Sequence, residues 1–170
     1  EKAIELLNAR LADAIDLKLQ AKQAHWNVKG RNFIAIHELF DAIAGRVDAQ
    51  VDDLAERVTA LGGVAEGTLQ AVAGKTGLAA YPLRLAGGEQ VARLADALAA
   101  YGKAARAAID EAAGFGDADT ADLFAFLWNG LADAQAAVSS GRGASASADF
   151  AASLSPIRQP PDPRASRNGP

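Results

Sequence analysis

The sequence contains no cysteine and no methionine among its 170 residues. The absence of cysteine excludes disulfides, thiolate metal sites and cysteine nucleophiles, and it is typical of a reducing compartment, so we expect a cytoplasmic protein. No apolar run approaches the roughly 20 residues that a membrane-spanning helix needs, and "EKAIELLNARL" has the pattern of an amphipathic helix rather than a signal peptide. The net charge of -4 argues against a body that is basic all over and coats nucleic acid.

The apolar residues recur at steps of three and four along most of the chain, which predicts helices. Half of the residues are hydrophobic, which is enough for one domain with a proper core. We predict long helices over residues 1–28, 33–61 and 89–113, and a fourth that begins within "DADTADLF" and ends near Val138. Gly62 and Gly63 are stop signals for the second helix, whereas Asp119 is a candidate cap of the fourth, with Asp122 at its third position.

The segment 64–88 is rich in glycine and small residues and predicts a long connection with a short helix near residues 69–73. Four long helices with one long connection between the second and third favour an all-α, ferritin-like four-helix bundle over residues 1–138. Residues 139–170 are rich in Ser, Ala, Pro and Arg and have little apolar periodicity, so we expect a flexible tail.

Both histidines of the chain lie in the stretch "AHWNVKGRNFIAIHELFD", as His25 and His37, and Asp41 follows one helical turn later. On the second helix, one outward arc of roughly 100° holds several residues with polar or small side chains, away from the apolar stripe. These are His37, Asp41, Gly45, Asp48, Asp52 and Glu56. Asp41 and Asp52 are about 16 Å apart along a helix, whereas metal–ligand bonds are about 2 Å, so one chain cannot complete a site.

The spacing is symmetric about a point between Arg46 and Val47. A twofold axis at that point, with two antiparallel copies of the helix, places His37 opposite Glu56 and Asp41 opposite Asp52, which is the pattern of an isologous dimer. Each dimer would then hold two metal sites made from both chains, and His25 is a plausible fifth ligand. Imidazole with several carboxylates suits iron or manganese better than structural zinc.

An ordinary structural interpretation also accounts for these residues. Aspartate and glutamate on a helix face are usually solvated surface residues, and Asp48 fits that description. His25 lies on an apolar stripe, where a histidine is more often buried with a backbone partner. The residue pattern by itself leaves both interpretations open.

The stretch "KQAHWNVKGRNFIAIHELFD", followed by "VDDLAERVTALGG", closely resembles the central motif of the Dps family, the DNA-binding proteins from starved cells. "AAYPL", "LAAYGKAARAAIDEA" and "GDADTADLF" resemble the same family in the same order, as far as about Phe124. The resemblance implies a two-iron ferroxidase centre at a twofold interface. Its ligands would be His25, His37 and Asp41 of one chain with Asp52 and Glu56 of the other. Trp26 matches the family tryptophan close to the iron. Its ordinary structural interpretation is a core aromatic, and it can be both.

The resemblance also implies a hollow shell of twelve subunits that binds Fe(II), oxidises it preferentially with hydrogen peroxide, or else with oxygen, and stores Fe(III) oxide inside. Asp119 and Asp122 match positions that line the iron-entry pores at the threefold axes, where a ring of carboxylates attracts Fe(II). After "ADLF" the sequence departs from the family pattern, and this leaves the packing of the last helix open.

A second function, structural DNA binding, depends on the termini. Many family members bind DNA through Lys-rich extensions that contact phosphates. No such N-terminal extension is visible here, and the C-terminal tail is only weakly basic. It has Arg142, Arg158, Arg164 and Arg167 against Asp149 and Asp162. We therefore expect an iron-oxidising storage enzyme, with a nucleoid-associated DNA-binding protein as the alternative.

Overall fold

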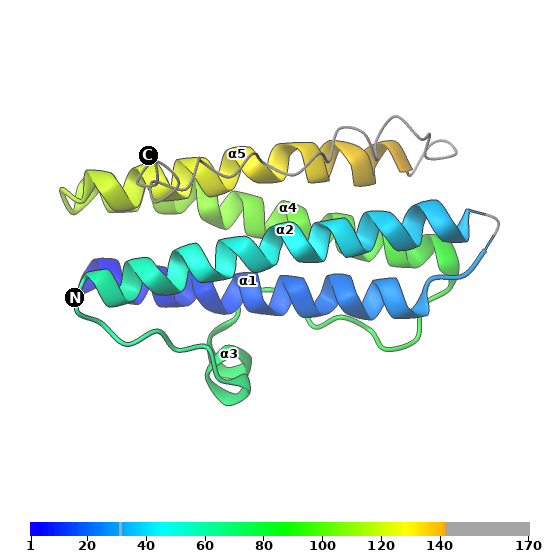
Figure 1. Cartoon of the computed structure of the whole chain (residues 1–170), viewed down its shortest axis with the longest axis horizontal. Coiled ribbons are helices and arrows are strands. Elements are labelled where there is room, and N and C mark those ends of the chain that lie inside the picture. The colour runs from blue at the N-terminus through cyan, green and yellow to red at the C-terminus, as the bar shows by residue number, and fades with distance from the viewer. Residues whose placement is uncertain (31, 142–170) are drawn as a thin grey trace, which may run out of the picture.

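The computed structural model describes residues 1–30 and 32–141 of the chain. Within these residues the chain forms five helices and no strand: α1 (Lys2–Asn27), α2 (Phe33–Ala60), α3 (Leu69–Lys75), α4 (Gly87–Gly114) and α5 (Ala118–Gly141). α1 packs against α2 and α4 against α5, and the short α3 lies beside α1 in the connection between the two pairs (Figure 1). The predicted all-α four-helix bundle, with a short helix in its long connection, is confirmed.

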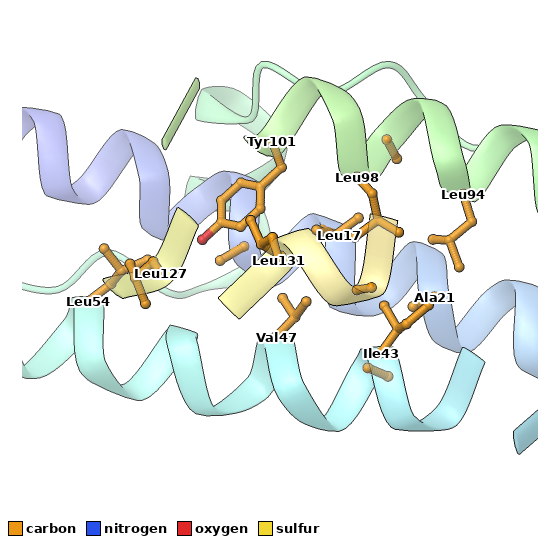
Figure 2. Packing of buried hydrophobic residues seen from close by; sticks show 14 of the residues in the cluster. Leu17, Ala21, Ile43, Val47, Leu54, Leu94, Leu98, Tyr101, Leu127 and Leu131 are labelled. Carbon is orange, nitrogen blue, oxygen red and sulfur yellow. The ribbon is translucent and has the colours of Figure 1, made fainter. Parts of the chain in front are cut away.

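The core lies between the four long helices and consists of their apolar stripes. On α2, five large apolar residues recur with the predicted helical spacing, and each is at most 1% exposed: Phe40, Ile43, Val47, Leu54 and Val58. Figure 2 shows Leu54 of α2 and Tyr101 of α4 close to Leu127 and Leu131 of α5. Leu127 and Leu131 lie in the part of the sequence that departs from the family pattern. This part nevertheless forms a helix that packs against α4 and also contacts α2.

The helix ends show which local signals act. The N–H of Gly63 donates to the carbonyl of Val58 at 3.0 Å, and Gly62 has a φ of +81°, so α2 ends in a glycine-dependent Schellman motif. The predicted stop at these two glycines is confirmed. α4 begins at Gly87, earlier than predicted, because the carboxylate of Glu89 accepts a hydrogen bond from the N–H of Ala86 at 2.8 Å.

The predicted cap of the last helix is wrong. α5 begins at Ala118, and the carboxylate of Asp117 accepts a hydrogen bond from the N–H of Thr120 at 3.1 Å, so Asp117 is the cap. The guanidinium of Arg57 also donates to Asp117 at 2.8 Å, which fixes this residue against α2. Asp119 therefore lies inside the first turn with its side chain 86% exposed, and Asp122 lies in the second turn.

Polar residues on α1 attach the long connection to the bundle. Asn8 donates to the carbonyl of Val64 at 3.0 Å, and Gln20 donates to the carbonyl of Ala79 at 3.1 Å. The N–H of Gly77 donates to the carboxylate of Asp13 at 2.7 Å. All three α1 side chains belong to buried residues. The connection therefore covers one side of α1 and leaves the outward face of α2 free.

The remaining fold predictions concern membrane-spanning helices, the end of α5 and the C-terminal tail. No helix of the described residues is both long and apolar enough to span a membrane. α5 continues to Gly141, beyond its predicted end near Val138. Residues 142–170 lie outside the described residues, together with the tail arginines Arg142, Arg158, Arg164 and Arg167.

Candidate metal centre

The predicted ligands on α2 lie on its outward face, away from the core. Asp41, Asp52 and Glu56 are exposed, and His37 is half-buried. Gly45 and Asp48, which lie between the two ligand pairs on the same face, are also exposed. The helix therefore buries one face in its own bundle and presents the other, which is rich in metal-binding side chains, outside it.

His25 and His37 form a pair across the turn between α1 and α2. Their rings are stacked with centroids 3.6 Å apart. Nδ1 of His25 lies 2.8 Å from the carbonyl oxygen of His37, and Nδ1 of His37 lies 3.0 Å from the carbonyl oxygen of His25. A carbonyl can only accept, so each Nδ1 carries a hydrogen, and the neutral form of each ring has its lone pair on Nε2. Backbone bonds of this kind fix the tautomer and orientation of metal-binding histidines.

Asp41 lies near this histidine pair and forms an ion pair with Lys22 of α1. The hydrogen bond from Lys22 lowers the pKa of Asp41; slight burial opposes this, while the charges of Lys22, His25 and His37 lower the pKa further. Asp41 is therefore ionised at neutral pH and lies within electrostatic reach of both imidazoles. His25, His37 and Asp41 form one half of the predicted ligand set.

Asp52 and Glu56 form the other half. Among the residues that the structure describes, neither side chain has a hydrogen bond or an ion pair. The adjacent Asp53 is half-buried; burial raises its pKa, and the charges of Glu56 and Asp52 raise it further. Three carboxylates within about one helical turn repel one another, and a cation at this position would relieve that repulsion.

The two halves do not meet within one chain. His37, Asp41, Asp52 and Glu56 all lie on the unbroken helix α2, which separates Asp41 from Asp52 by about 16 Å. In the described part of a single chain, no three His, Asp or Glu side chains come close enough together to hold a metal ion. The geometry therefore provides two partial ligand sets on one exposed face.

Comparisons with known proteins identify the family of the chain. A model of the ferritin-like domain matches residues 4–136. The chain is 47% identical over 128 residues to the DNA protection during starvation protein of Agrobacterium fabrum, and the match covers 71% of this chain and 75% of that protein. The chain belongs to the Dps family.

Solved Dps structures support the same assignment. The chain resembles DpsA14 from Streptomyces coelicolor with a TM-score of 0.78 and 35% identity, over 82% of this chain and 83% of that one. It resembles a Dps protein from Bacillus brevis with a TM-score of 0.78 and 27% identity, over 82% of this chain and 93% of that one. The predicted ferritin-like fold and the predicted membership of the Dps family are both confirmed.

Trp26 of this Dps chain is not a core aromatic. It follows His25 at the end of α1, and it is 66% exposed. Ile34, at the start of α2, is 63% exposed, and Phe33 beside it has its ring centroid 5.0 Å from that of His37. The interpretation of Trp26 as a buried core residue is therefore wrong, because most of its side chain is exposed to solvent.

The predicted pore residues of this Dps chain lie at the start of α5. Asp119 and Asp122 are both exposed, but Asp119 lies 3.8 Å from the guanidinium of Arg57. Arg57 also donates to Thr120 at 3.0 Å and to Asp117 at 2.8 Å. Arg57 therefore holds the start of α5 against α2 and leaves the Asp119 side chain exposed to solvent.

Sequence reasoning missed the lysines of α1. Lys22 forms an ion pair with Asp41, and Lys18 forms one with Asp48, so two residues one turn apart on α1 meet two carboxylates on α2. The four-residue spacing of the lysines was a visible signal, because it places both on one face of a helix. It could not show which carboxylates they meet, since this depends on how α1 lies against α2.

Proposed function

We propose that this Dps chain is a ferroxidase and iron-storage protein whose iron sites are shared between two copies. Each site would combine His25, His37 and Asp41 of one chain with Asp52 and Glu56 of the other. Fe(II) is the substrate. The chain would act in the cytoplasm, store the Fe(III) product inside a dodecameric shell, and so protect DNA from oxidative damage.

The observation that carries this proposal is the state of the two histidines. Both Nδ1 atoms bond to backbone carbonyls at 2.8 and 3.0 Å, which leaves both Nε2 lone pairs available to a metal. Asp41 adds an ionised carboxylate nearby. Imidazole nitrogen with carboxylate oxygen is a donor set that suits iron.

The symmetric spacing on α2 supports a shared site. Asp52 and Glu56 are exposed, and their side chains have no hydrogen bond or ion pair in the described part of their own chain. An antiparallel second copy would bring them opposite Asp41 and His37. Gly45 near the centre would allow the two helices to approach closely, because it has no side chain and open space around it.

The shared carboxylates would hold two Fe(II) ions close together and offset their positive charge. Two Fe(II) ions each give up one electron, and one hydrogen peroxide takes both electrons and two protons to become two waters. Because both electrons arrive together, no hydroxyl radical is released. The protein's own contribution is to place the two ions, through fixed imidazoles and carboxylates, where one oxidant molecule reaches both.

A complementation experiment tests whether the site is shared. His37→Ala and Glu56→Ala should each slow Fe(II) oxidation by peroxide at least about 100-fold, since each removes a ligand. When the two variants are co-expressed in equal amounts, mixed dimers contain one site with all five ligands. Stopped-flow absorbance should then show about a quarter of the parental number of active sites.

The matched control co-expresses His37→Ala with Asp41→Ala. Both changes fall in the same half of the ligand set, so every site in a mixed dimer stays damaged and no activity should return. Parental kinetics in the single variants would refute the site. Inactive single variants with no recovery in the His37→Ala and Glu56→Ala mixture would refute the sharing.

DNA binding through the C-terminal tail is the second candidate function. The name of the Agrobacterium fabrum relative refers to DNA protection, and the tail of this chain carries four arginines. A gel-shift series at increasing salt should compare the full chain with a chain that ends at Gly141. Binding that persists without the tail would exclude the tail, and no binding by the full chain would exclude this function.

A further inference from the structure

Two ion pairs join α1 to the outward face of α2. Lys22 pairs with Asp41, and Lys18 pairs with Asp48. The pairs are closely matched: each lysine side chain is 34% exposed, while Asp41 is 52% and Asp48 is 54% exposed. Only Asp41 belongs to the proposed ligand set. The chain therefore holds one proposed iron ligand and one neighbouring carboxylate in the same way.

The ammonium of Lys22 already occupies one of the two carboxylate oxygens of Asp41. It donates a hydrogen bond to Oδ1 of Asp41. A lysine has a long flexible stem, and one that is partly exposed can move its ammonium into solvent at small cost.

We propose that Lys22 is an internal counter-ion of the iron site, which an entering divalent cation must displace from Asp41. This inference rests on the proposed function. The pair holds Asp41 beside the two histidines in the metal-free protein. A divalent ion brings two positive charges in place of one and also binds imidazole nitrogen, so it displaces the ammonium from Asp41. A monovalent cation carries no more charge than the ammonium and does not displace it. Lys22 thus lowers the affinity of the site for every cation and favours divalent ones.

Cobalt(II) is a suitable probe, because it takes the same donor types and is not consumed by oxidation under these conditions. Visible-absorption titration of the metal-free assembled protein gives its Kd. Lys22→Met removes the charge and keeps the length of the side chain. It should tighten cobalt binding about fivefold, the upper end of what a partly exposed ion pair contributes. Lys22→Arg keeps the charge and should restore the parental Kd.

Lys18→Met is the matched control. It removes an ion pair of the same exposure from the same helix, but its partner Asp48 is not a proposed ligand. Its cobalt Kd should stay within about twofold of the parent. If cobalt binding tightened equally in both lysine variants, the cause would be the change in the net charge of the protein, and the displacement model would be wrong. Weaker or unchanged binding in Lys22→Met would also overturn it, because Lys22 would then orient Asp41 rather than compete for it.

The His37→Ala variant separates this inference from the proposed function. If His37→Ala binds cobalt as the parent does, the proposed site itself fails. If His37→Ala loses cobalt binding while Lys22→Met leaves the Kd unchanged, only the role of Lys22 fails. Thermal melting of all variants checks that they fold, and Lys22→Gln provides a second neutral replacement if Lys22→Met is unstable.

Discussion

The carboxylates of this chain differ sharply in burial and in whether they have hydrogen-bond or ion-pair partners within the chain. Asp13 on α1 is buried at 1% exposure, accepts a hydrogen bond from the N–H of Gly77 at 2.7 Å and forms an ion pair with Arg10 at 2.9 Å. Asp52 and Glu56 on α2 are exposed, and within the described residues their side chains have no hydrogen bond or ion pair. Asp13 thus stabilises the fold through its contacts, whereas the side chains of Asp52 and Glu56 make no such contacts.

Asp117 at the start of α5 belongs with Asp13. It is only 18% exposed and accepts hydrogen bonds from Arg57 and Thr120. A carboxylate that holds elements together is satisfied within the chain, because a buried unpaired charge is costly. A carboxylate that is left unpaired beside other acids destabilises the isolated chain slightly. The carboxylates that are available to bind a cation are therefore those that make no stabilising contact within the chain.

Asp13→Ala should cause the largest loss of stability. It leaves the Gly77 N–H and the Arg10 guanidinium without their partner, so the free energy of unfolding should fall by about 3 kcal/mol. Chemical denaturation at fixed protein concentration measures this. As a control, Asp16→Ala removes one hydrogen bond, from Thr76 at 2.8 Å, and should cost about 1 kcal/mol or less. Equal losses in both variants would show that Asp13 is not the key anchor of the connection.

Asp117→Asn should have an intermediate effect that depends on pH. Burial raises the pKa of Asp117, but hydrogen bonds from Thr120 and Arg57 together with the Arg57 charge outweigh it, and the net pKa is lowered. The ionised carboxylate therefore stabilises the folded chain fully above about pH 5, and this contribution is lost progressively as the pH falls below about 4. The variant should be about 1 kcal/mol less stable at neutral pH.

Thermal melting between neutral and acid pH tests this prediction. The melting curves of Asp117→Asn and the parent should approach each other as the pH falls. Asp119→Asn is the control, because that side chain is 86% exposed, and it should melt like the parent throughout. A constant difference between Asp117→Asn and the parent at every pH would mean that the charge of Asp117 plays no part.

Asp52→Asn and Glu56→Gln should have the smallest effect on stability in metal-free buffer. Each removes one of the charges that raise the pKa of Asp53, so the change should lie within about 0.5 kcal/mol and tend towards stabilisation. Denaturation with a chelator present measures it. If either variant loses more than about 1 kcal/mol, its carboxylate serves the fold, and the contrast with Asp13 disappears.

Much of the fold follows from the sequence, because helix formation and burial leave a local signal. The helical period of α2 and its stop at Gly62 and Gly63 were predicted from the sequence. The start of α5 was not: Asp117 and Asp119 both precede a helical pattern, and only the contact of Asp117 with Arg57 on another helix distinguishes them. The sequence also did not determine the exposure of Trp26, because an aromatic residue at the end of a helix can be either buried or exposed.

The sequence by itself determined the faces of each helix, because the period of 3.6 residues fixes which side chains share a side. It therefore placed His37, Asp41, Asp52 and Glu56 together on one face of α2, away from the core. Only the tertiary structure decided the stacking of His25 on His37 and the pairing of Lys22 with Asp41. These contacts join two helices across a turn, and their geometry depends on the crossing and register of α1 and α2, which no local pattern specifies.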